Sequence, residues 1–189
     1  MRFYCKENYD TLLKQLVKEG NEVNSTYELL SQMISTRLIT TNEIIDMFNL
    51  DPIILNRFIT AITTFDKDVI GPYITEKYFL IFPALKDAVV RLKDDCLETR
   101  RCVIQFPKEH CFQAIQFLIR DNTVNVVCYM RSCDAIKNLP YDLWLCSALA
   151  DMFSRYTCEL TGVNTYKEHK INMVFGSLHV YKEDIKDVF

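Results

Sequence analysis

The sequence predicts an α+β protein in which a mixed sheet packs on a long central helix. Three observations support this prediction. Apolar residues recur at helical spacing through much of residues 1–65. After residue 101 the chain changes to short segments rich in β-branched and aromatic residues. A long stretch from Leu139 then carries an apolar stripe over several helical turns, and such a succession of helices and strands is typical of an α+β fold.

Residues 1–65 are expected to be helical. In the first segment, apolar residues recur one turn apart before Gly20, which could end that helix. The helical segments expected after it are residues 27–39, 41–48 and 53–62. Thr41 or Asn42 would cap the second of these, and Pro52 would open the third.

A turn and a further helix are expected in the middle of the chain. Gly71, Pro72 and Tyr73 form a turn signal, and Pro83 fits the first position of a helix. The apolar stripe of that helix consists of Leu85, Val89, Leu92 and Cys96.

Strands are expected from residue 101 onward, beginning with the short β-rich segment 101–106. Asp121 and Asn122 separate residues 111–119 from residues 124–130 and predict a hairpin. Both faces of the second segment are largely apolar, so we expect it to be covered on both sides.

Leu139 and Pro140 begin the long helix, because proline is tolerated in a first helical turn. The expected buried stripe of this helix is Leu143, Cys146, Leu149, Ala150 and Phe153. Two closing strands, residues 171–175 and 178–181, are expected on either side of Gly176.

The composition indicates one domain, residues 1–189, with a helical part over residues 1–65 and a core over residues 71–185. The net charge of −3 provides no general field for nucleic acid or membranes. No apolar run approaches the roughly 20 residues that a bilayer requires, and the first ten residues are charged rather than signal-like. We therefore expect a cytoplasmic protein without nucleic-acid or membrane partners.

The eight cysteines show neither a disulfide framework nor zinc-ligand spacing. There is no C-x-x-C pair, and Cys128 and Cys133 are five positions apart. We expect no metal, and we expect most of these thiols to be reduced and buried.

Reactive side chains concentrate in four short segments, residues 110–113, 131–134, 139–142 and 176–181. Taken singly, each has an ordinary interpretation. Arg131 and Asp134 could form a surface ion pair, and Asp142 could stabilise a helix N-terminus. His179 and Tyr181 could be core residues with satisfied polar tips. Their joint occurrence in a fixed order favours a shared site.

This order resembles the thymidylate synthase and pyrimidine hydroxymethylase family, from about Gly71 to Ile185. The resemblance is strongest between Cys111 and Asp142. Its motifs are Cys111, Gln116-Phe117, Arg131-Ser132-Cys133-Asp134, Leu139-Pro140-Tyr141, the Gly-x-x-His-x-Tyr of Gly176, His179 and Tyr181, and the pair Arg100-Arg101. The resemblance is specific because the motifs occur in the family order and because the separations between Cys111, residues 131–134 and residues 139–141 match the family pattern.

The resemblance implies that Cys111 adds as a thiolate to C6 of a pyrimidine and makes C5 a carbon nucleophile. Arg131 and Ser132 would bind the phosphate of a deoxyribonucleoside monophosphate. Arg100 and Arg101 would reach the phosphate bound by the neighbouring subunit, because the family site is shared across a homodimer.

The resemblance also assigns roles to four further residues. His179 and Tyr181 would hydrogen-bond the sugar 3′-hydroxyl, and Asp134 would organise the folate and pyrimidine side of the site. Asp142, the second candidate catalytic residue, stands where thymidylate synthases carry Asn. A carboxylate suits the amino group and protonated N3 of cytosine, which favours dCMP over dUMP.

The implied enzyme is a dCMP hydroxymethylase-like transferase of the phage type. It would move a one-carbon unit from methylene-tetrahydrofolate to C5 of dCMP, and water would complete 5-hydroxymethyl-dCMP. Such an enzyme would act in the cytoplasm of a bacteriophage host. The alternatives are an enzyme of the hydroxymethylase or thymidylate synthase type that uses dUMP, and a non-catalytic nucleotide-binding homologue.

Two positions depart from the family pattern. His110 precedes Cys111, where the family has Pro. The family also places a proton-relaying glutamate in an upstream helix, and Asn56 or Arg57 stands nearest to that place here. Glu28 and Glu43 are acids elsewhere in the N-terminal part that the sequence leaves unassigned.

Overall fold

The structure is a computed structural model of the 189-residue chain. It describes residues 1, 3, 5–37, 39–64, 81–93, 97–162, 166 and 168–186. These residues form a six-stranded mixed sheet and several helices, so the predicted α+β class is confirmed. The expected turn at Gly71 and the expected core position of Cys96 lie outside the described residues.

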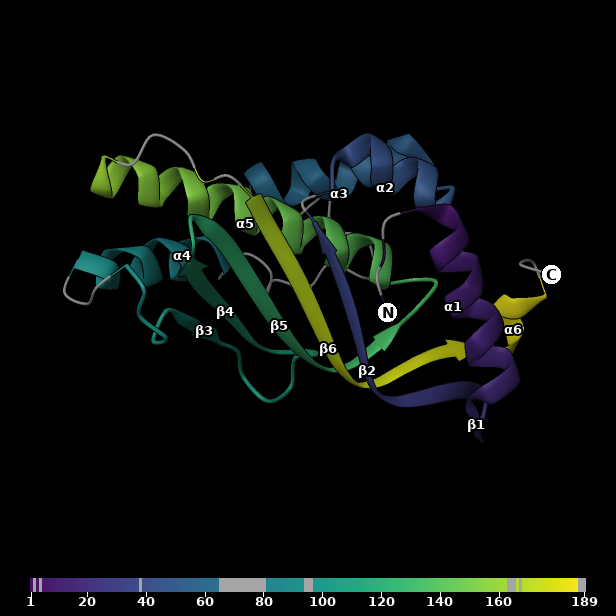
Figure 1. The fold of residues 1–189 in the computed structure, drawn as a ribbon. Coiled ribbons are helices and arrows are strands. Elements are labelled where there is room, and N and C mark those ends of the chain that lie inside the picture. The colour runs from purple at the N-terminus through teal and green to yellow at the C-terminus, as the bar shows by residue number, and fades with distance from the viewer. Residues whose placement is uncertain are drawn as a thin grey trace.

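Along the chain, helices and strands occur in short groups of one type (Figure 1). The helices are α1 (Lys6–Glu19), α2 (Thr41–Phe48), α3 (Pro52–Thr64), α4 (Ile81–Val90), α5 (Leu139–Thr161) and α6 (Lys182–Ile185), with a 3₁₀ turn at Arg91–Lys93. The strands are β1 (Asn21–Val23), β2 (Thr26–Arg37), β3 (Val103–Gln105), β4 (Phe112–Arg120), β5 (Thr123–Asp134) and β6 (Glu168–Tyr181).

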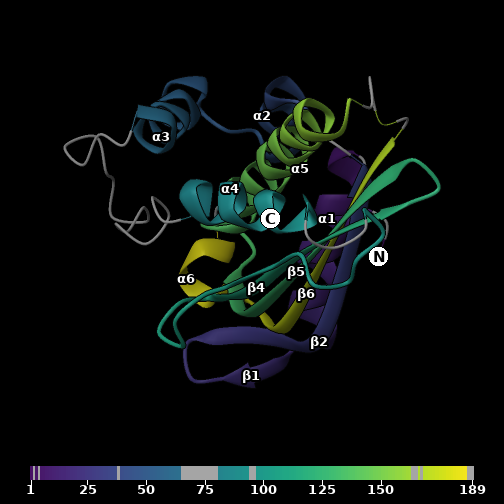
Figure 2. The ribbon, with the colours of Figure 1, turned by 90° about the vertical axis from the view of Figure 1, so that its left-hand side faces the viewer.

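The strand order in the sheet is β1-β2-β6-β5-β4-β3. The pair β5 and β6 is parallel, and the other neighbours are antiparallel. Parallel neighbours require a long crossover, and α5 provides it while lying along one face of the sheet (Figures 1 and 2). The predicted stripe of α5 is fully buried there, and the ring of Phe153 stacks on that of Phe117 with 4.6 Å between centroids.

The hairpin between β4 and β5 is confirmed. Asp121 and Asn122 have φ values of 50° and 60°, which is the left-handed conformation that a tight hairpin turn demands. The helix expected before Gly20 is confirmed as α1. The helix expected from Pro52 is confirmed as α3. Pro83 is the third residue of α4 rather than its first, which still places it in the first turn.

The prediction of a helix over residues 27–39 is wrong, because residues 27–37 belong to the strand β2. Tyr27 and Leu29 pack against the core before Ser31, whereas Ile34 is buried after it. Ser31 has a φ of 53°, so the inward-facing positions change from odd to even at that residue. This switch breaks the period of two that marks a strand in a sequence. Pairing with β6 along its length then decides the structure of the segment.

The two closing strands are one continuous strand, β6, and Gly176 lies inside it. A Cβ atom on Gly176 would stand 2.8 Å from the carbonyl oxygen of Arg131 on β5. The glycine therefore permits a close approach of two backbones and does not end a strand.

The sheet bends along a line that crosses its central strands. Ser31, Gly176 and Arg131 all fall at gaps in the register of paired residues. On β4 the register shifts between Phe112 and Ala114. Both β2 and β6 change direction in their middle (Figure 1). The candidate site residues of β5 and β6 come just after this line.

In the part of the chain that the structure describes, only one face of the sheet is covered, whereas residues 124–130 were expected to be covered on both faces. Val124 and Val126 are fully buried beneath the helices. On the other face Tyr129 is 43% exposed, and its neighbours across the strands include Met33, which is 51% exposed. Within the described part of the chain, these apolar side chains of the second face therefore remain largely exposed.

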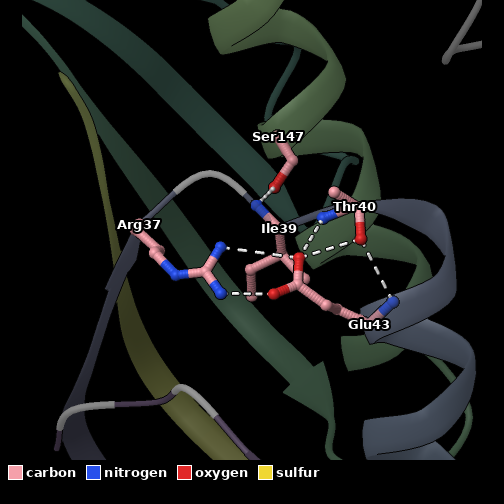
Figure 3. Close-up of polar contacts among 5 residues, drawn as sticks. All are labelled: Arg37, Ile39, Thr40, Glu43 and Ser147. Atoms are coloured by element: carbon pink, nitrogen blue, oxygen red, sulfur yellow. Dashed lines mark hydrogen bonds and ion pairs between the residues drawn. The ribbon is translucent and has the colours of Figure 1, made fainter. Parts of the chain in front are cut away.

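The N-terminus of α2 is anchored to the end of β2 (Figure 3). Thr40 is the cap, rather than Thr41 or Asn42 as expected. The hydroxyl of Thr40 accepts from the backbone N–H of Glu43, and the Glu43 carboxylate accepts from the backbone N–H of Thr40. Arg37 also forms an ion pair with Glu43.

Across the described residues, no helix combines the length and apolar character that a membrane crossing requires.

Candidate active site

Cys111 lies directly before β4, beside the end of β5. Its Sγ is 3.7 Å from the hydroxyl oxygen of Ser132, and its carbonyl accepts from the backbone N–H of Arg131 at 2.7 Å. The Cys111 side chain is half-buried, and that of Arg131 is exposed. The structure therefore brings the candidate nucleophile to the predicted phosphate-binding pair without sealing it in the core.

A row of polar residues continues from Ser132 across β6 to β2. Ser132 and Ser177 are register partners on β5 and β6. The hydroxyl of Ser177 donates to the carboxylate of Glu28 on β2. Glu28 is also the register partner of His179. The sequence did not predict this position of Glu28, because residues 27–39 were assigned to a helix. Only the pairing of β2 with β6 reveals it.

His179 and Tyr181 occupy one face of β6 close to its end. Their rings meet edge to face, with 5.6 Å between the centroids, and both side chains are half-buried. His179 is in register with Asp134 on β5 as well as with Glu28 on β2. The predicted sugar-binding residues thus adjoin the strand that carries Ser132.

Asp134 is buried, and its carboxylate shapes the turn that leads to α5. Its Oδ1 accepts from the backbone N–H groups of Ile136 and Lys137, at 2.8 and 2.9 Å. This is the side-chain bonding by which aspartate fixes a tight turn. The turn sets the spacing between the segment of Ser132 and the start of α5.

Asp142 is buried in the first turn of α5. The thiol of Cys133 donates to its Oδ2 at 3.6 Å. Burial, followed by the charges of Asp142 and Asp134, raises the pKa of Cys133 well above its ordinary value. Cys133 therefore remains a neutral thiol that donates to Asp142, one residue after the Ser132 that contacts Cys111.

Arg100 and Arg101 are not brought to Cys111 within one chain. They are exposed and precede β3, and the side chain of Gln116 donates to the carbonyl of Arg100 at 2.9 Å. Gln116 is five positions beyond Cys111 along an extended strand, a separation of about 17 Å. Their predicted role in a neighbouring subunit is compatible with this placement and stays a prediction.

The candidate positions for an upstream glutamate differ in their surroundings. Asn56 and Arg57 are exposed on α3. Glu43 is engaged in the cap of α2. Of the two glutamates that the sequence leaves unassigned, Glu28 borders the strands of the candidate site.

Seven cysteines lie in the described residues, and all are free thiols. The buried ones are Cys102, Cys128, Cys133 and Cys146. Burial raises the pKa of Cys102 to about 12, which makes it an inert core residue. No group of three metal-ligating side chains comes together in the parts of the chain that the structure describes.

A comparison with known families gives a match over this part of the chain. Residues 100–189 match the family model of thymidylate synthase. The matched range holds β3 to β6, α5 and the candidate residues from Arg100 to Tyr181, whereas the positions considered for the upstream glutamate, Glu28, Glu43, Asn56 and Arg57, lie before it. The match supports, in general terms, a transferase of nucleotide biosynthesis that moves a folate-borne one-carbon unit to a nucleotide. No curated protein matches the chain.

Proposed function

We propose that the protein transfers a one-carbon unit to C5 of dCMP and forms 5-hydroxymethyl-dCMP. The observation that carries this proposal is the contact between the Cys111 thiol and Ser132, next to Arg131. We propose that residues 1–189 act as one domain, in the cytoplasm of a phage host.

Cys111 supplies the nucleophile. Its sulfur forms a bond to C6 of the pyrimidine, and the electron pair displaced from the C5–C6 double bond makes C5 nucleophilic. C5 would then bond to the carbon that the folate supplies and lose its proton, and the bond from that carbon to the folate nitrogen would break with its electron pair leaving on nitrogen. Water would add to the exocyclic carbon that remains. The Cys111–C6 bond then breaks and returns the thiolate.

Asp142 would select cytosine. Its carboxylate accepts a hydrogen bond from Cys133 and has further acceptor sites for the amino group and protonated N3 of the base. The hydrogen bond from Cys133 would thereby also restrict the orientation of the Asp142 carboxylate.

Methylene-tetrahydrofolate would supply the one-carbon unit when bound. Asp134 is the residue proposed for its side of the site. The turn uses Oδ1 of Asp134, and the second oxygen of a carboxylate has acceptor sites of its own. A carboxylate acceptor fits a ligand that is rich in N–H donors.

Glu28 would relay the protons of the reaction. It is linked to Cys111 through the Ser177 hydrogen bond and the register pair of Ser177 with Ser132. A carboxylate in this chain of contacts could exchange protons with the reacting carbons through a bridging water, as general acid–base catalysis allows.

A homodimer would complete the phosphate site. The sheet face opposite the helices exposes Leu30 (55%), Met33 (51%) and Tyr129 (43%). Apolar side chains that are exposed together on one face favour burial against a second copy of the chain. That packing would allow Arg100 and Arg101 of one subunit to approach the phosphate held by Arg131 and Ser132 of the other.

The test is tritium release from C5-tritiated dCMP and dUMP, with and without methylene-tetrahydrofolate. Release from dCMP that is abolished in Cys111→Ser is the expected result. Cys158→Ser, another half-buried free thiol, serves as the matched control. Release from dUMP alone would instead support a dUMP enzyme, and tight nucleotide binding without release would support a non-catalytic homologue.

A further inference from the structure

Three groups converge on the ammonium of Lys137, which lies in the turn between β5 and α5. Its Nζ is 2.7 Å from Oδ2 of Asp184 and 3.8 Å from Oε1 of Glu183, both on α6. It also lies over the ring of Tyr181, 4.9 Å from the centroid. One cation thus connects the turn before α5 to the end of β6 and the helix that follows.

The backbone on which Lys137 stands is tightly held. Its N–H donates to Oδ1 of Asp134, and the hydroxyl of Tyr9 on α1 donates to the carbonyl of Ala135 at 3.2 Å. The backbone N–H of Ala135 donates to the carbonyl of His179 at 2.8 Å. The Lys137 side chain therefore extends from a rigid base toward Tyr181.

Charge favours this arrangement. The hydrogen bond to Asp184, the largest cause, raises the pKa of Lys137, so its ammonium stays protonated. A cation is attracted to the face of an aromatic ring. None of the four residues of α6 is fully buried, and Ile185 is the one that packs, partly buried, against the core.

We propose that Lys137 is a positioning residue that holds the ring of Tyr181, and with it the hydroxyl that binds the sugar of the nucleotide. This inference rests on the proposed function. Lys137 touches neither the base nor the reacting sulfur in that scheme. It orients Tyr181 by fixing the ring face and by tying α6, which follows Tyr181 directly, to the turn before α5.

The test compares dCMP with 2′,3′-dideoxy-CMP, which lacks the 3′-hydroxyl, by isothermal titration calorimetry. One net hydrogen bond corresponds to about a fivefold preference for dCMP, and the hydroxyl of Tyr181 would supply one of the two bonds to the 3′-hydroxyl. Lys137→Met is expected to lower the preference for dCMP by about that factor of five while leaving the Kd of the dideoxy nucleotide unchanged. Lys137→Arg, which keeps the cation, is expected to restore the preference.

Asp184→Asn removes the nearer of the two anionic partners of Lys137 without altering the turn, so it tests the same idea if Lys137→Met unfolds. Arg155→Met is the matched control, because it breaks the exposed pair with Asp151 on α5. Equal weakening of both nucleotides in Lys137→Met would show a merely structural role and overturn the inference. If the wild type binds neither nucleotide, the proposed function fails and the inference fails with it.

Discussion

Replacing Gly176 by alanine should damage both the sheet and the candidate site. The added Cβ would stand 2.8 Å from the carbonyl oxygen of Arg131, well inside ordinary contact. Both atoms belong to backbones of central strands, which are held by pairing on each side. Relief requires a shift of about half an ångström, and overpacking of this kind costs about 2 kcal/mol.

The expected result is a Tm lower by roughly 4–8 °C for a chain of this size. Because the shift acts on the carbonyl of Arg131, it should also displace Ser132 and weaken dCMP binding. Differential scanning calorimetry measures the first effect, and titration calorimetry measures the second.

Gly162→Ala is the matched control for this change. Gly162 ends α5 with a φ of +72°, and a Cβ there would meet no atom within 4 Å. Alanine in that conformation costs about 1 kcal/mol, without any contact near β5. It should lower the Tm and leave dCMP affinity unchanged. Wild-type stability and affinity in Gly176→Ala would refute the reasoning about the close approach.

Three further predictions concern carboxylates. Asp142→Asn should shift tritium release from dCMP toward dUMP, and an unchanged ratio of the two would remove the basis for cytosine selection. Glu28→Gln keeps an acceptor for Ser177 but loses the charge, so turnover should fall by about 100-fold or more while the Kd of dCMP changes little; undiminished turnover would exclude a proton relay. The hydrogen bond from Arg37 holds the pKa of Glu43 down, to about 2. Such a carboxylate stabilises the fold above its ordinary pKa of about 4.3 and loses that effect as the pH falls through about 2. The difference in free energy of unfolding between wild type and Glu43→Gln should therefore be constant from pH 5 to 8, no more than about 1 kcal/mol for this exposed pair, and should shrink in acid. A difference that persists at pH 2 would contradict the assignment.

Local signals predicted much of the fold. Asp121 and Asn122 demand a tight turn whatever surrounds them, and the stripe of α5 is long enough to define a buried helix. The strand β2 could not be recognised, because Ser31 reverses its inward-facing positions and the pairing partner β6 is distant in the chain. Because residues 27–39 were predicted to be a helix, the position of Glu28 beside His179 could not be predicted either.

The order of motifs placed most of the candidate site on neighbouring strands. Cys111 and Ser132 do lie in contact, and Asp142 is joined to the same segment through Cys133. Their roles stay predictions until the assays above are done. No pattern in the sequence indicated Lys137, because its partners Tyr181 and Asp184 become neighbours only when β6 lies beside β5.

The strand order has a consequence for how the molecule is assembled. β6 is the last strand of the sheet along the chain, yet it lies between β2 and β5. A nascent polypeptide that has not yet emerged past Glu168 would contain two separate parts of the sheet, β1-β2 and β5-β4-β3. In each part, the edge that later pairs with β6 would be unpaired. Such borders invite association with other chains. The exposed strands β2 and β5 are therefore covered only after β6 has been synthesised and has paired with both.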